Sequence, residues 1–328
     1  EIGQGVASRK YLPLFKSRFR LKLFTTSLFL AGLGISLGIA ACSPTPPSTN
    51  SSSNEQAIKL NLVSFSVTQA AHEKIIPQFV KKWEQEHHQT VTFETSYGGS
   101  GAQTRAILEG GQEADIVHLS IVPDVQKLEQ AGLVQPGWEE EFPNDSIVSR
   151  SVLAIVTREG NPKKIQNWAD LTKENVSVIT PNPKNSGGAR WNFLALWNAA
   201  LKAGNNEAQA LDYVTKVYKN APVLPDTARE ATDAFFVNKQ GDVLLTYENE
   251  VILKAISGEK LPYFIPDVNF SIDNPVAIVD RNVDKHGTRA IAEAFINYLY
   301  SPEAQQELAK IGYRPIAPNS LQDKAALD

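Results

Sequence analysis

The pattern of apolar and polar positions changes its period repeatedly along the chain. Residues 58–66 alternate apolar with polar side chains, as a half-buried strand does, whereas residues 69–88 place apolar side chains at helical spacing. Repeated strand–helix units predict an α/β protein with mostly parallel sheets and helices on their faces. The pattern predicts further strands at 91–96, 115–119, 152–156, 176–179, 223–224, 243–247 and 275–279, and further helices at 103–110, 124–131, 189–202, 208–218, 228–239, 251–257, 288–300 and from 302 onward.

The composition is that of an ordinary globular protein, with 42% hydrophobic and 21% charged residues among 328. About 270 residues follow the alternating pattern, which is more than one hydrophobic core comfortably fills, so we expect two α/β lobes. Cys42 is the sole cysteine, so no internal disulfide can form. The formal net charge of −4 does not indicate the basic face that a nucleic-acid partner would need, and we expect none.

The first 42 residues differ from the rest of the chain. Six basic residues between positions 9 and 22 precede an uncharged apolar run at 23–41, and Ile39-Ala40-Ala41-Cys42 closes it. A basic segment, an apolar segment and small residues before a cleavage point are typical of an export signal. The tetrapeptide resembles the lipobox of bacterial lipoproteins, in which the cysteine is lipidated and becomes the first mature residue. We therefore expect a signal peptide at residues 1–41 and a lipid anchor at Cys42.

Two other interpretations of this region stay open: an uncleaved membrane helix, since about 20 apolar residues span a bilayer, or a buried thiol. Residues 42–57 are rich in Ser, Pro, Thr and Asn and predict a flexible tether. Without residues 1–41 the chain has 26 basic and 35 acidic residues, a formal net charge of −9, so an anionic ligand would bind against the overall charge. The chain opens with Glu1 and contains no methionine, and we expect its natural start to lie upstream.

Small or hydroxyl residues gather at three places where a predicted strand gives way to a helix. The places are YGGSGA at 97–102, NSGGAR at 185–190 and PDTAR at 225–229. A helix start leaves N–H groups without partners and is the positive end of the helix dipole. Glycine lets the backbone approach a ligand and Ser or Thr adds a hydroxyl donor, so such a place suits a tetrahedral oxyanion. Taken singly, each of the three is more often an ordinary turn or helix cap.

Other site chemistries find less support in the sequence. No Gly-Lys-Ser/Thr follows at the spacing of a phosphate-binding Walker loop, and Gly98-Gly99-Ser100-Gly101 lacks one residue of a GxSxG hydrolase elbow. The five histidines and the single cysteine form no cluster with metal-ligand spacing. We therefore expect neither a metal nor a cofactor.

Six stretches, in consistent order and spacing, carry a family resemblance. The most specific is VSVITPNPKNSGGARWN at 176–192; the others are YGGSG at 97–101, EADIV at 113–117, GNPK at 160–163, GDVL at 241–244 and YLYSPEAQ at 298–305. Through them, residues 58–318 resemble the periplasmic sulfate-binding proteins of ABC transporters, a family that also includes thiosulfate binders. The resemblance implies two lobes joined by crossover segments, with the ligand in the cleft between them. We expect lobe 1 at 58–148, completed by 268–328, and lobe 2 at 149–267; family members continue beyond the end of this sequence.

The family holds sulfate through uncharged donors, mostly backbone N–H groups at helix starts. Carried over by position, the resemblance implies that the sulfate-binding residues are Ser100, Ser186, Gly187, Gly188 and Ala228. A sixth family donor is a tryptophan ring N–H, and the corresponding residue here is Tyr247, whose phenol can also donate. Phosphate keeps a proton near neutral pH and sulfate does not, so a site made only of donors predicts a preference for sulfate.

Charged residues flank two of these positions. Asp226 and Glu230 lie beside Ala228 where the family has small residues, and we expect them to cap the helix. Arg190 and Arg229 each follow a proposed site, and we interpret them as partners of carboxylates and not as ligands of the anion.

These observations predict an extracytoplasmic sulfate-binding protein that delivers sulfate to the permease of an ABC transporter and is not an enzyme. We expect a monomer in the periplasm, anchored to the membrane by lipid at Cys42. Thiosulfate or another tetrahedral oxyanion is the alternative ligand, and a sensor without a transport role also stays open. A remote rival is a lipid-anchored hydrolase with Ser100 or Ser186 as nucleophile, which would need a histidine such as His118 beside that serine.

Overall fold

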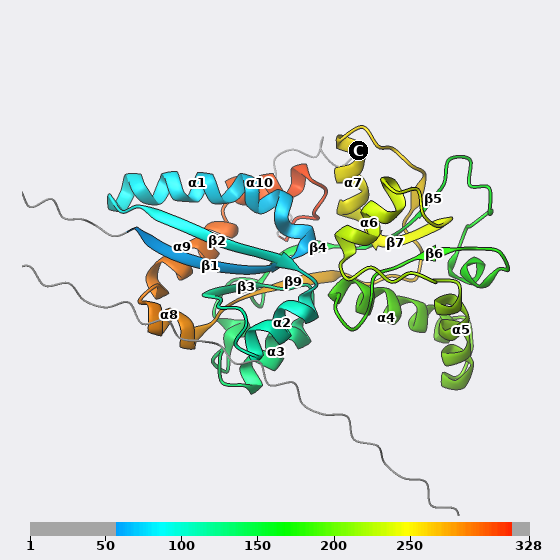
Figure 1. The fold of residues 1–328 in the computed structure, drawn as a ribbon, viewed down its shortest axis with the longest axis horizontal. Coiled ribbons are helices and arrows are strands. Elements are labelled where there is room, and N and C mark those ends of the chain that lie inside the picture. Colours follow the sequence, from blue (N-terminus) through cyan, green and yellow to red (C-terminus); the bar gives the residue numbers. More distant parts are fainter. Residues whose placement is uncertain (1–56, 317–328) are drawn as a thin grey trace, which may run out of the picture. The chain divides into compact units, whose positions relative to one another are not determined.

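Two β-sheets organise the computed structural model of this chain, which describes residues 57–316 (Figure 1). We call the five-stranded sheet, with the order β2-β1-β3-β9-β4, and its helices lobe 1. Its strands are β1 (Ile58–Phe65), β2 (Val91–Gly98), β3 (Ile116–His118), β4 (Ile147–Ser151) and β9 (Ile272–Ile278). Its helices are α1 (Gln69–His87), α2 (Ser100–Leu108), α3 (Val122–Gln130), α8 (Asp280–His286), α9 (Arg289–Leu299) and α10 (Pro302–Lys310).

Lobe 2 contains the four-stranded sheet, which has the order β6-β7-β5-β8. Its strands are β5 (Leu153–Thr157), β6 (Val178–Ile179), β7 (Val243–Tyr247) and β8 (Tyr263–Phe264). Its helices are α4 (Gly187–Lys202), α5 (Glu207–Lys219), α6 (Ala228–Phe236) and α7 (Glu248–Ile256). Short 3-10 helices lie at η1 (Ser66–Thr68), η2 (Trp138–Glu140) and η3 (Trp168–Thr172).

Side chains of successive strand residues point to opposite faces of a sheet, and both sheets are covered by helices on both faces. In β1, Leu60 and Leu62 belong to a buried cluster with α1 and α9, whereas Val63 belongs to a cluster with α2 and α3. In β5, Leu153 shares a cluster with α4 and α5, and Ala154 shares one with α6 and α7. The α/β architecture with two sheets and flanking helices is therefore confirmed.

The sheets are mixed, which corrects the expectation that they are mostly parallel. β1 pairs in parallel with β2 and β3, and β6 with β7, but β9 runs antiparallel to β3 and β4, and β5 antiparallel to β7 and β8. The strands that break the parallel order lie next to the points where the chain changes lobe. Such a strand enters its sheet from the other lobe, without the helical crossover that a parallel connection needs.

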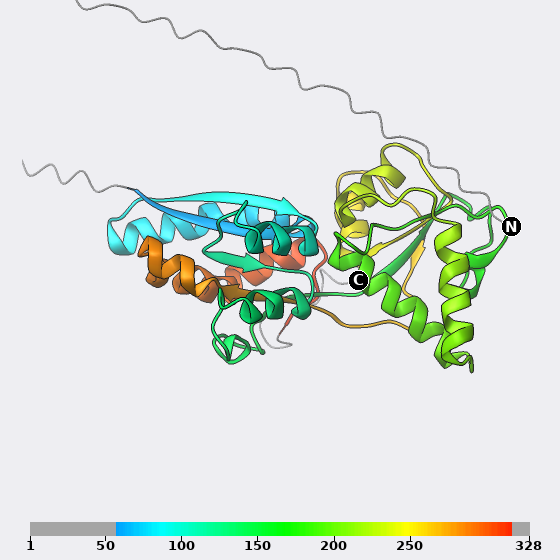
Figure 2. The same cartoon turned by 60° about the horizontal axis from the view of Figure 1, so that its bottom comes forward.

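The chain passes between the lobes where β4 leads into β5 and again before β9, as Figure 2 shows. β4 and β9 pair with each other, and Asn269 joins the two passages just beyond them. The Asn269 side chain accepts from the Leu153 N–H at 3.1 Å and donates to the Leu153 carbonyl oxygen at 2.8 Å. The two crossing segments therefore run side by side.

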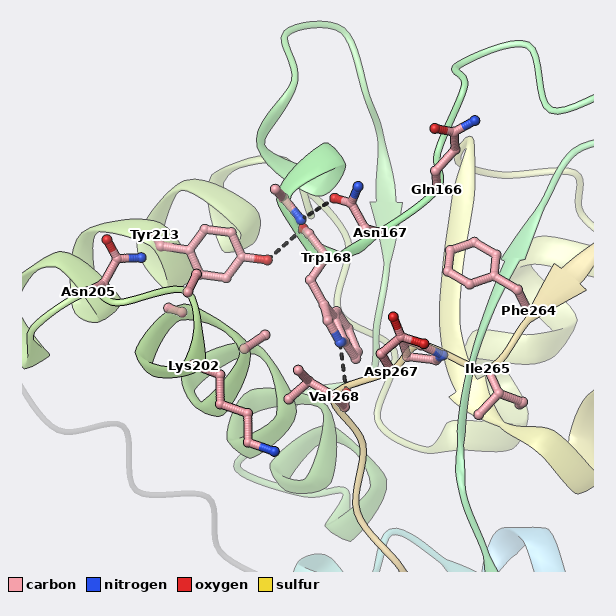
Figure 3. A pocket seen from close by; sticks show the side chains of 15 residues that line it. Gln166, Asn167, Trp168, Lys202, Asn205, Tyr213, Phe264, Ile265, Asp267 and Val268 are labelled. Atoms are coloured by element: carbon pink, nitrogen blue, oxygen red, sulfur yellow. Dashed lines mark hydrogen bonds between the residues drawn. The ribbon is translucent and has the colours of Figure 1, made fainter.

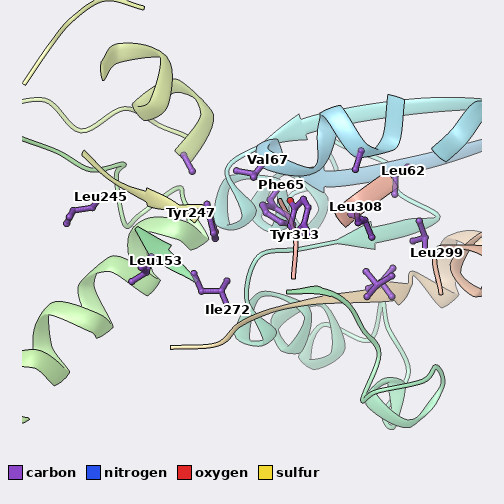
Figure 4. Close-up of a cluster of buried hydrophobic side chains, with 14 of the residues drawn as sticks. Leu62, Phe65, Val67, Leu153, Leu245, Tyr247, Ile272, Leu299, Leu308 and Tyr313 are labelled. Carbon is purple, nitrogen blue, oxygen red and sulfur yellow. The ribbon is translucent and has the colours of Figure 1, made fainter. Parts of the chain in front are cut away.

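One buried apolar cluster extends through both lobes (Figure 4). It includes Leu62 and Leu308 in lobe 1, and Leu153 and Leu245 in lobe 2. Phe65, at the end of β1, and Tyr247, at the end of β7, come together within it, with ring centroids 6.2 Å apart. The carboxyl ends of strands from both sheets are thus adjacent.

Local predictions fail at one strand and at several helix ends. Residues 223–224 form no strand, because Pro222 and Pro225 flank them and proline cannot donate to a strand ladder. The helix predicted from Gln103 begins three residues earlier, at Ser100. No helix within residues 57–316 is long and apolar enough to cross a bilayer.

Candidate functional site

Helices begin at all three places where the sequence gathers small and hydroxyl residues. α2 begins at Ser100, α4 at Gly187 and α6 at Ala228. The residue before each helix has an extended backbone. The Ser186 side chain accepts from the third N–H of α4 and the Thr227 side chain from the third N–H of α6. The first two N–H groups of both helices therefore lack a partner within the helix or from its cap.

The three helix starts lie against one another across the lobes. A Cβ atom built on Gly99 would lie 2.5 Å from the carbonyl oxygen of Asn185 and 3.0 Å from that of Asp226. A Cβ atom on Gly187 would lie 3.2 Å from the Cβ of Ser100. A side chain at position 99 would therefore collide with the Asn185 backbone, since Cβ atoms essentially never lie closer than 3.0 Å to another heavy atom. Glycine at this position permits the close approach of the backbones.

Tyr247 lies at the same junction, at the end of β7. A Cβ atom built on Gly188 would lie 2.9 Å from the Tyr247 hydroxyl oxygen. The tyrosine is 2% exposed, and burial raises the pKa of its phenol, so the hydroxyl keeps its proton. Its oxygen lies 2.7 Å from the Ser120 Oγ, with either hydroxyl able to donate.

A buried ion pair connects the lobes beside this junction. Arg190 of α4 donates through both terminal nitrogens to the two carboxylate oxygens of Asp124 in α3. Asp124 is fully buried and also accepts from the Ser100 hydroxyl at 2.7 Å and from Lys127 Nζ at 3.1 Å. Burial by itself would raise the pKa of Asp124. The hydrogen bonds and the charge of Arg190, together with hydrogen bonds from Ser100 and Lys127, hold this pKa below its usual value.

A second buried pair lies entirely within lobe 2. Arg229 Nε and Nη2 of α6 each donate at 2.7 Å to the carboxylate of Glu250 in α7, which is 1% exposed. Both arginines thus pair with carboxylates, as the sequence led us to expect. Their fork geometry is bidentate, which fixes both partners in position.

The acidic residues beside Ala228 have different roles. Glu230 completes a capping box, because its carboxylate accepts from the Thr227 N–H at 3.1 Å while its own N–H donates to the Thr227 Oγ1. Asp226 does not cap the helix: its carboxylate accepts from the Asn185 side chain at 2.6 Å. The capping expectation holds for Glu230 and is wrong for Asp226.

The structure brings most of the predicted anion-binding residues together. Ser100, Gly187, Gly188 and Tyr247 are linked by the short approaches described above, and Ser186 immediately precedes Gly187. Ala228 belongs to the same buried cluster as Phe65 and Tyr247, and Asp226, two residues before it, approaches Gly99. Their role as anion donors stays a prediction.

Sequence reasoning missed Ser120, Asp124 and the indole of Trp191. Trp191 Nε1 donates to the Ser120 carbonyl oxygen at 2.9 Å. The usable signal was position, since Ser120 follows a predicted strand closely, where side chains of α/β folds meet ligands. Ser120 lies in the loop before α3 and not at a helix start.

The histidine required by a serine hydrolase is not beside either candidate serine. The Ser100 hydroxyl donates to Asp124, and the Ser186 hydroxyl caps α4. His118 contacts His72 at 3.2 Å and the Ser149 hydroxyl at 3.3 Å instead. Burial, with the nearby His72, lowers the pKa of His118 well below its usual value. Residues 57–316 also hold no group of three His, Cys, Asp or Glu residues that could bind a metal, and Cys42 lies outside the described residues.

A pocket of about 420 Å³ lies elsewhere, in lobe 2 between α4, α5 and residues 264–268 (Figure 3). Its aromatic residues use their polar groups within the protein: Trp168 Nε1 donates to the Val268 carbonyl oxygen at 2.8 Å, and the Tyr213 hydroxyl donates to the Trp168 carbonyl oxygen at 2.6 Å. None of the predicted anion-binding residues lines this pocket.

Comparisons with known proteins agree on one family. The profile of the family described as bacterial extracellular solute-binding protein matches residues 62–314. A sulfate-binding protein of Synechococcus elongatus is 49% identical over 93% of this chain and 86% of its own length. A sulfate-binding protein of Synechocystis sp. is 54% identical over 85% of this chain and 80% of its own length.

Two more distant proteins extend the same comparison. A thiosulfate-binding protein of Pseudomonas aeruginosa is 37% identical over 92% of this chain and 86% of its own length. Among solved structures, the sulfate-binding protein SubI of Mycobacterium tuberculosis matches with a TM-score of 0.71 and 35% identity, covering 80% of this chain and 88% of that one.

Proposed function

Because the chain belongs to the family of bacterial extracellular solute-binding proteins, we propose that it binds sulfate in the periplasm and delivers it to the permease of an ABC transporter. The observation that carries this proposal is the meeting of three helix starts from two lobes. Sulfate would lie between the starts of α2, α4 and α6, in contact with Ser100, Ser186, Gly187, Gly188, Ala228 and Tyr247.

Oriented neutral donors explain how an acidic protein can bind a dianion. Unpartnered N–H groups at a helix start carry partial positive charge and act at short range, so the overall charge does not decide binding. The Ser100 hydroxyl is already committed to Asp124, so Ser100 offers its backbone N–H. The Ser186 oxygen accepts from Ala189, which leaves the Ser186 hydrogen free to donate.

The two buried carboxylates around the junction are already paired. Asp124 and Arg190 neutralise each other, as do Glu250 and Arg229. A paired carboxylate repels sulfate far less than a free one, and a paired arginine does not supply an uncompensated charge to the site. The anion is therefore expected to be held by dipoles and hydroxyl groups.

Parallel calorimetric titrations with sulfate, thiosulfate, molybdate and phosphate test this proposal. Sulfate should bind, and phosphate should bind more weakly, because hydrogen phosphate offers three bare oxygens to the N–H donors where sulfate offers four. Absence of binding to any tetrahedral oxyanion would contradict the proposal. Thiosulfate is the second candidate ligand, favoured by the replacement of the family's tryptophan with Tyr247, and the same titrations rank the two.

We also propose that the protein is not an enzyme. The hydrogen bonds of Ser100, Ser186 and His118 support this, because a serine nucleophile needs a base within hydrogen-bond reach. Turnover of ester substrates that is abolished by Ser100→Ala would contradict it.

The attachment to the membrane is a separate part of the proposal. We propose that residues 1–41 are removed as a signal peptide and that lipid on Cys42 anchors the protein, with 42–57 as tether. Cys42→Ser should move the protein from the detergent phase to the aqueous phase on detergent partitioning. Unchanged partitioning would show that the apolar run at 23–41 is the anchor.

The lobe limits proposed from the sequence are 58–148 with 268–328 for lobe 1, and 149–267 for lobe 2. The sheet order supports them, although β4 extends lobe 1 to Ser151. We propose further that the protein acts as a monomer, which sedimentation at several concentrations would check.

A further inference from the structure

Ser120, which follows β3, has its backbone fixed by contacts with both lobes. Its N–H donates to the Ser100 Oγ at 3.2 Å. Its carbonyl oxygen accepts from Trp191 Nε1 of α4 at 2.9 Å and from the Asn274 side chain of β9 at 3.2 Å. The residue is 1% exposed, so its side chain is held inside the protein at the junction of the helix starts.

The Ser120 hydroxyl forms a pair with the Tyr247 hydroxyl, at 2.7 Å between the oxygens. Each oxygen lies against one of the two glycines that begin α4. A Cβ atom on Gly187 would be 2.5 Å from the Ser120 Oγ, and one on Gly188 would be 2.9 Å from the Tyr247 oxygen. The hydroxyl pair therefore borders the backbone that we propose as the main source of donors.

The hydrogens of this pair can be counted. Two hydroxyl groups bring two hydrogens, and the bond between them uses one. The second hydrogen is free to point at a bound anion. The oxygen whose hydrogen is used within the pair still has a lone pair, so it can accept a hydrogen from the ligand. An indole N–H in the position of Tyr247 could only donate.

We propose that Ser120 is a specificity-determining residue, which together with Tyr247 allows the site to take a tetrahedral oxyanion that still carries one proton, such as hydrogen phosphate or hydrogen arsenate. This inference rests on the proposed function, because it requires that anions bind at these helix starts. Sulfate stays the preferred ligand, since it offers four bare oxygens to the N–H donors and hydrogen phosphate offers three. The preference is smaller than it would be in a site made only of donors.

Competitive titrations of sulfate and phosphate at about pH 8 test the inference, with wild type, Ser120→Ala, Tyr247→Phe and the double variant. The double variant has neither acceptor nor donor at this position, so phosphate loses the partner of its proton. We expect phosphate affinity to fall more than sulfate affinity, raising the sulfate-to-phosphate ratio by roughly tenfold in the double variant and by less in each single variant.

A matched control and a second variant separate specificity from folding. Ser146→Ala removes a buried hydroxyl of lobe 1 that donates to the Trp138 carbonyl oxygen at 2.7 Å, and it should leave the ratio unchanged. Tyr247→Trp combined with Ser120→Ala places a ring that only donates at the junction, and should raise the ratio while keeping sulfate binding.

The outcomes distinguish the two proposals. If the double variant and the tryptophan variant bind sulfate but keep the wild-type ratio, the inference is overturned and the proposed function stands. If wild type binds neither anion, the proposed function fails and the inference fails with it. A ratio that falls in the double variant would also overturn the inference, because the pair would then act only as a donor.

Discussion

Two buried arginine–carboxylate pairs, each just after the start of a helix, differ in what they connect. Arg190 of α4 in lobe 2 pairs with Asp124 of α3 in lobe 1, whereas Arg229 and Glu250 both belong to lobe 2. The two carboxylates are equally buried, at 0% and 1% exposure. The chemistry is the same, so any difference in effect must come from the position of the pair in the fold.

This position predicts different functions for the two pairs. The pair within lobe 2 exists whether or not the lobes touch, so it should contribute to folding alone. The pair between the lobes exists only when they are together, so it should favour the arrangement in which the helix starts meet. A ligand that needs this arrangement binds more weakly when the arrangement becomes less populated.

The largest effect is expected for Arg229→Met. The substitution leaves Glu250 buried without its partner, which should lower the free energy of unfolding by about 3–5 kcal/mol. Chemical denaturation monitored by circular dichroism measures the loss. Lys216→Met is the control, because it breaks an exposed pair with Asp212 in the same lobe and should cost less than about 1 kcal/mol. Similar losses in the two variants would contradict the structural role of the buried pair.

A smaller effect, mainly on binding, is expected for Arg190→Met. With the lobes apart, Asp124 can be hydrated, so the free energy of unfolding should fall less than in Arg229→Met. Sulfate affinity should fall roughly tenfold to a hundredfold, because the bound arrangement would bury a carboxylate whose remaining cationic partner is the half-exposed Lys127. Calorimetric titration measures the loss of sulfate affinity, and chemical denaturation of the same samples measures the loss of stability. Unchanged affinity together with a large loss of stability would show that the two pairs are equivalent.

The smallest effect on sulfate binding is expected from a change of pH, which should alter the free energy of unfolding while leaving sulfate affinity constant. The pKa of Asp124 is held below its usual value, so this carboxylate stays ionised and sulfate affinity should be constant from about pH 5 to 8. Burial lowers the pKa of His72 to about 3. Below about pH 6.5 the unfolded chain therefore binds more protons than the folded one, and stability should fall by up to about 1.4 kcal/mol per pH unit for each such histidine.

Substitution of this histidine gives the matching measurement. His72→Gln should flatten the pH dependence of unfolding below about pH 6.5. Sulfate affinity that declines in step with stability between about pH 6.5 and 5 would contradict the separation of the two properties.

The sequence predicted the parts of the fold that depend on local pattern. α1 and α5 follow from their periodicity, since each buries one continuous face, and β1 follows from its alternation although residues 62–65 are buried on both faces. The start of α2 at Ser100 was missed because Ser100-Gly101 has weak helix propensity; in the fold, the Ala102 N–H of this first turn donates to the Asn185 carbonyl oxygen of lobe 2 at 3.1 Å. The antiparallel pairing of β9 depends on where the chain crosses between lobes, which no local pattern records.

In the candidate site, too, the features set by local sequence could be predicted and those set by long-range contacts could not. Small residues and hydroxyls at helix starts could be recognised because helix starts have a sequence signature. Asp124 could not be assigned to the site, because its partners Ser100 and Arg190 lie 24 and 66 residues away and meet it only after folding. For Ser120 the place after a predicted strand was a usable signal, but its bond to Tyr247, which spans 127 residues, was not.

Deleting one backbone donor tests the central claim, that N–H groups at helix starts bind sulfate. Ala228→Pro is suited to this, because Ala228 is the first residue of α6 and Thr227 before it has the extended backbone that proline requires. Proline at Gly188 would be less clean, since a Cβ atom there lies 2.9 Å from Tyr247. Glu207→Pro, at the first position of α5 after an equally extended residue, is the matched control.

The measurement is a calorimetric sulfate titration of wild type, Ala228→Pro and Glu207→Pro, each checked for cooperative thermal unfolding. Loss of one donor to a charged ligand should cost about 1.5–3 kcal/mol. We predict that Ala228→Pro binds sulfate roughly tenfold to a hundredfold more weakly than wild type and that Glu207→Pro binds it equally well. Wild-type affinity in folded Ala228→Pro would contradict the claim that the start of α6 holds the anion.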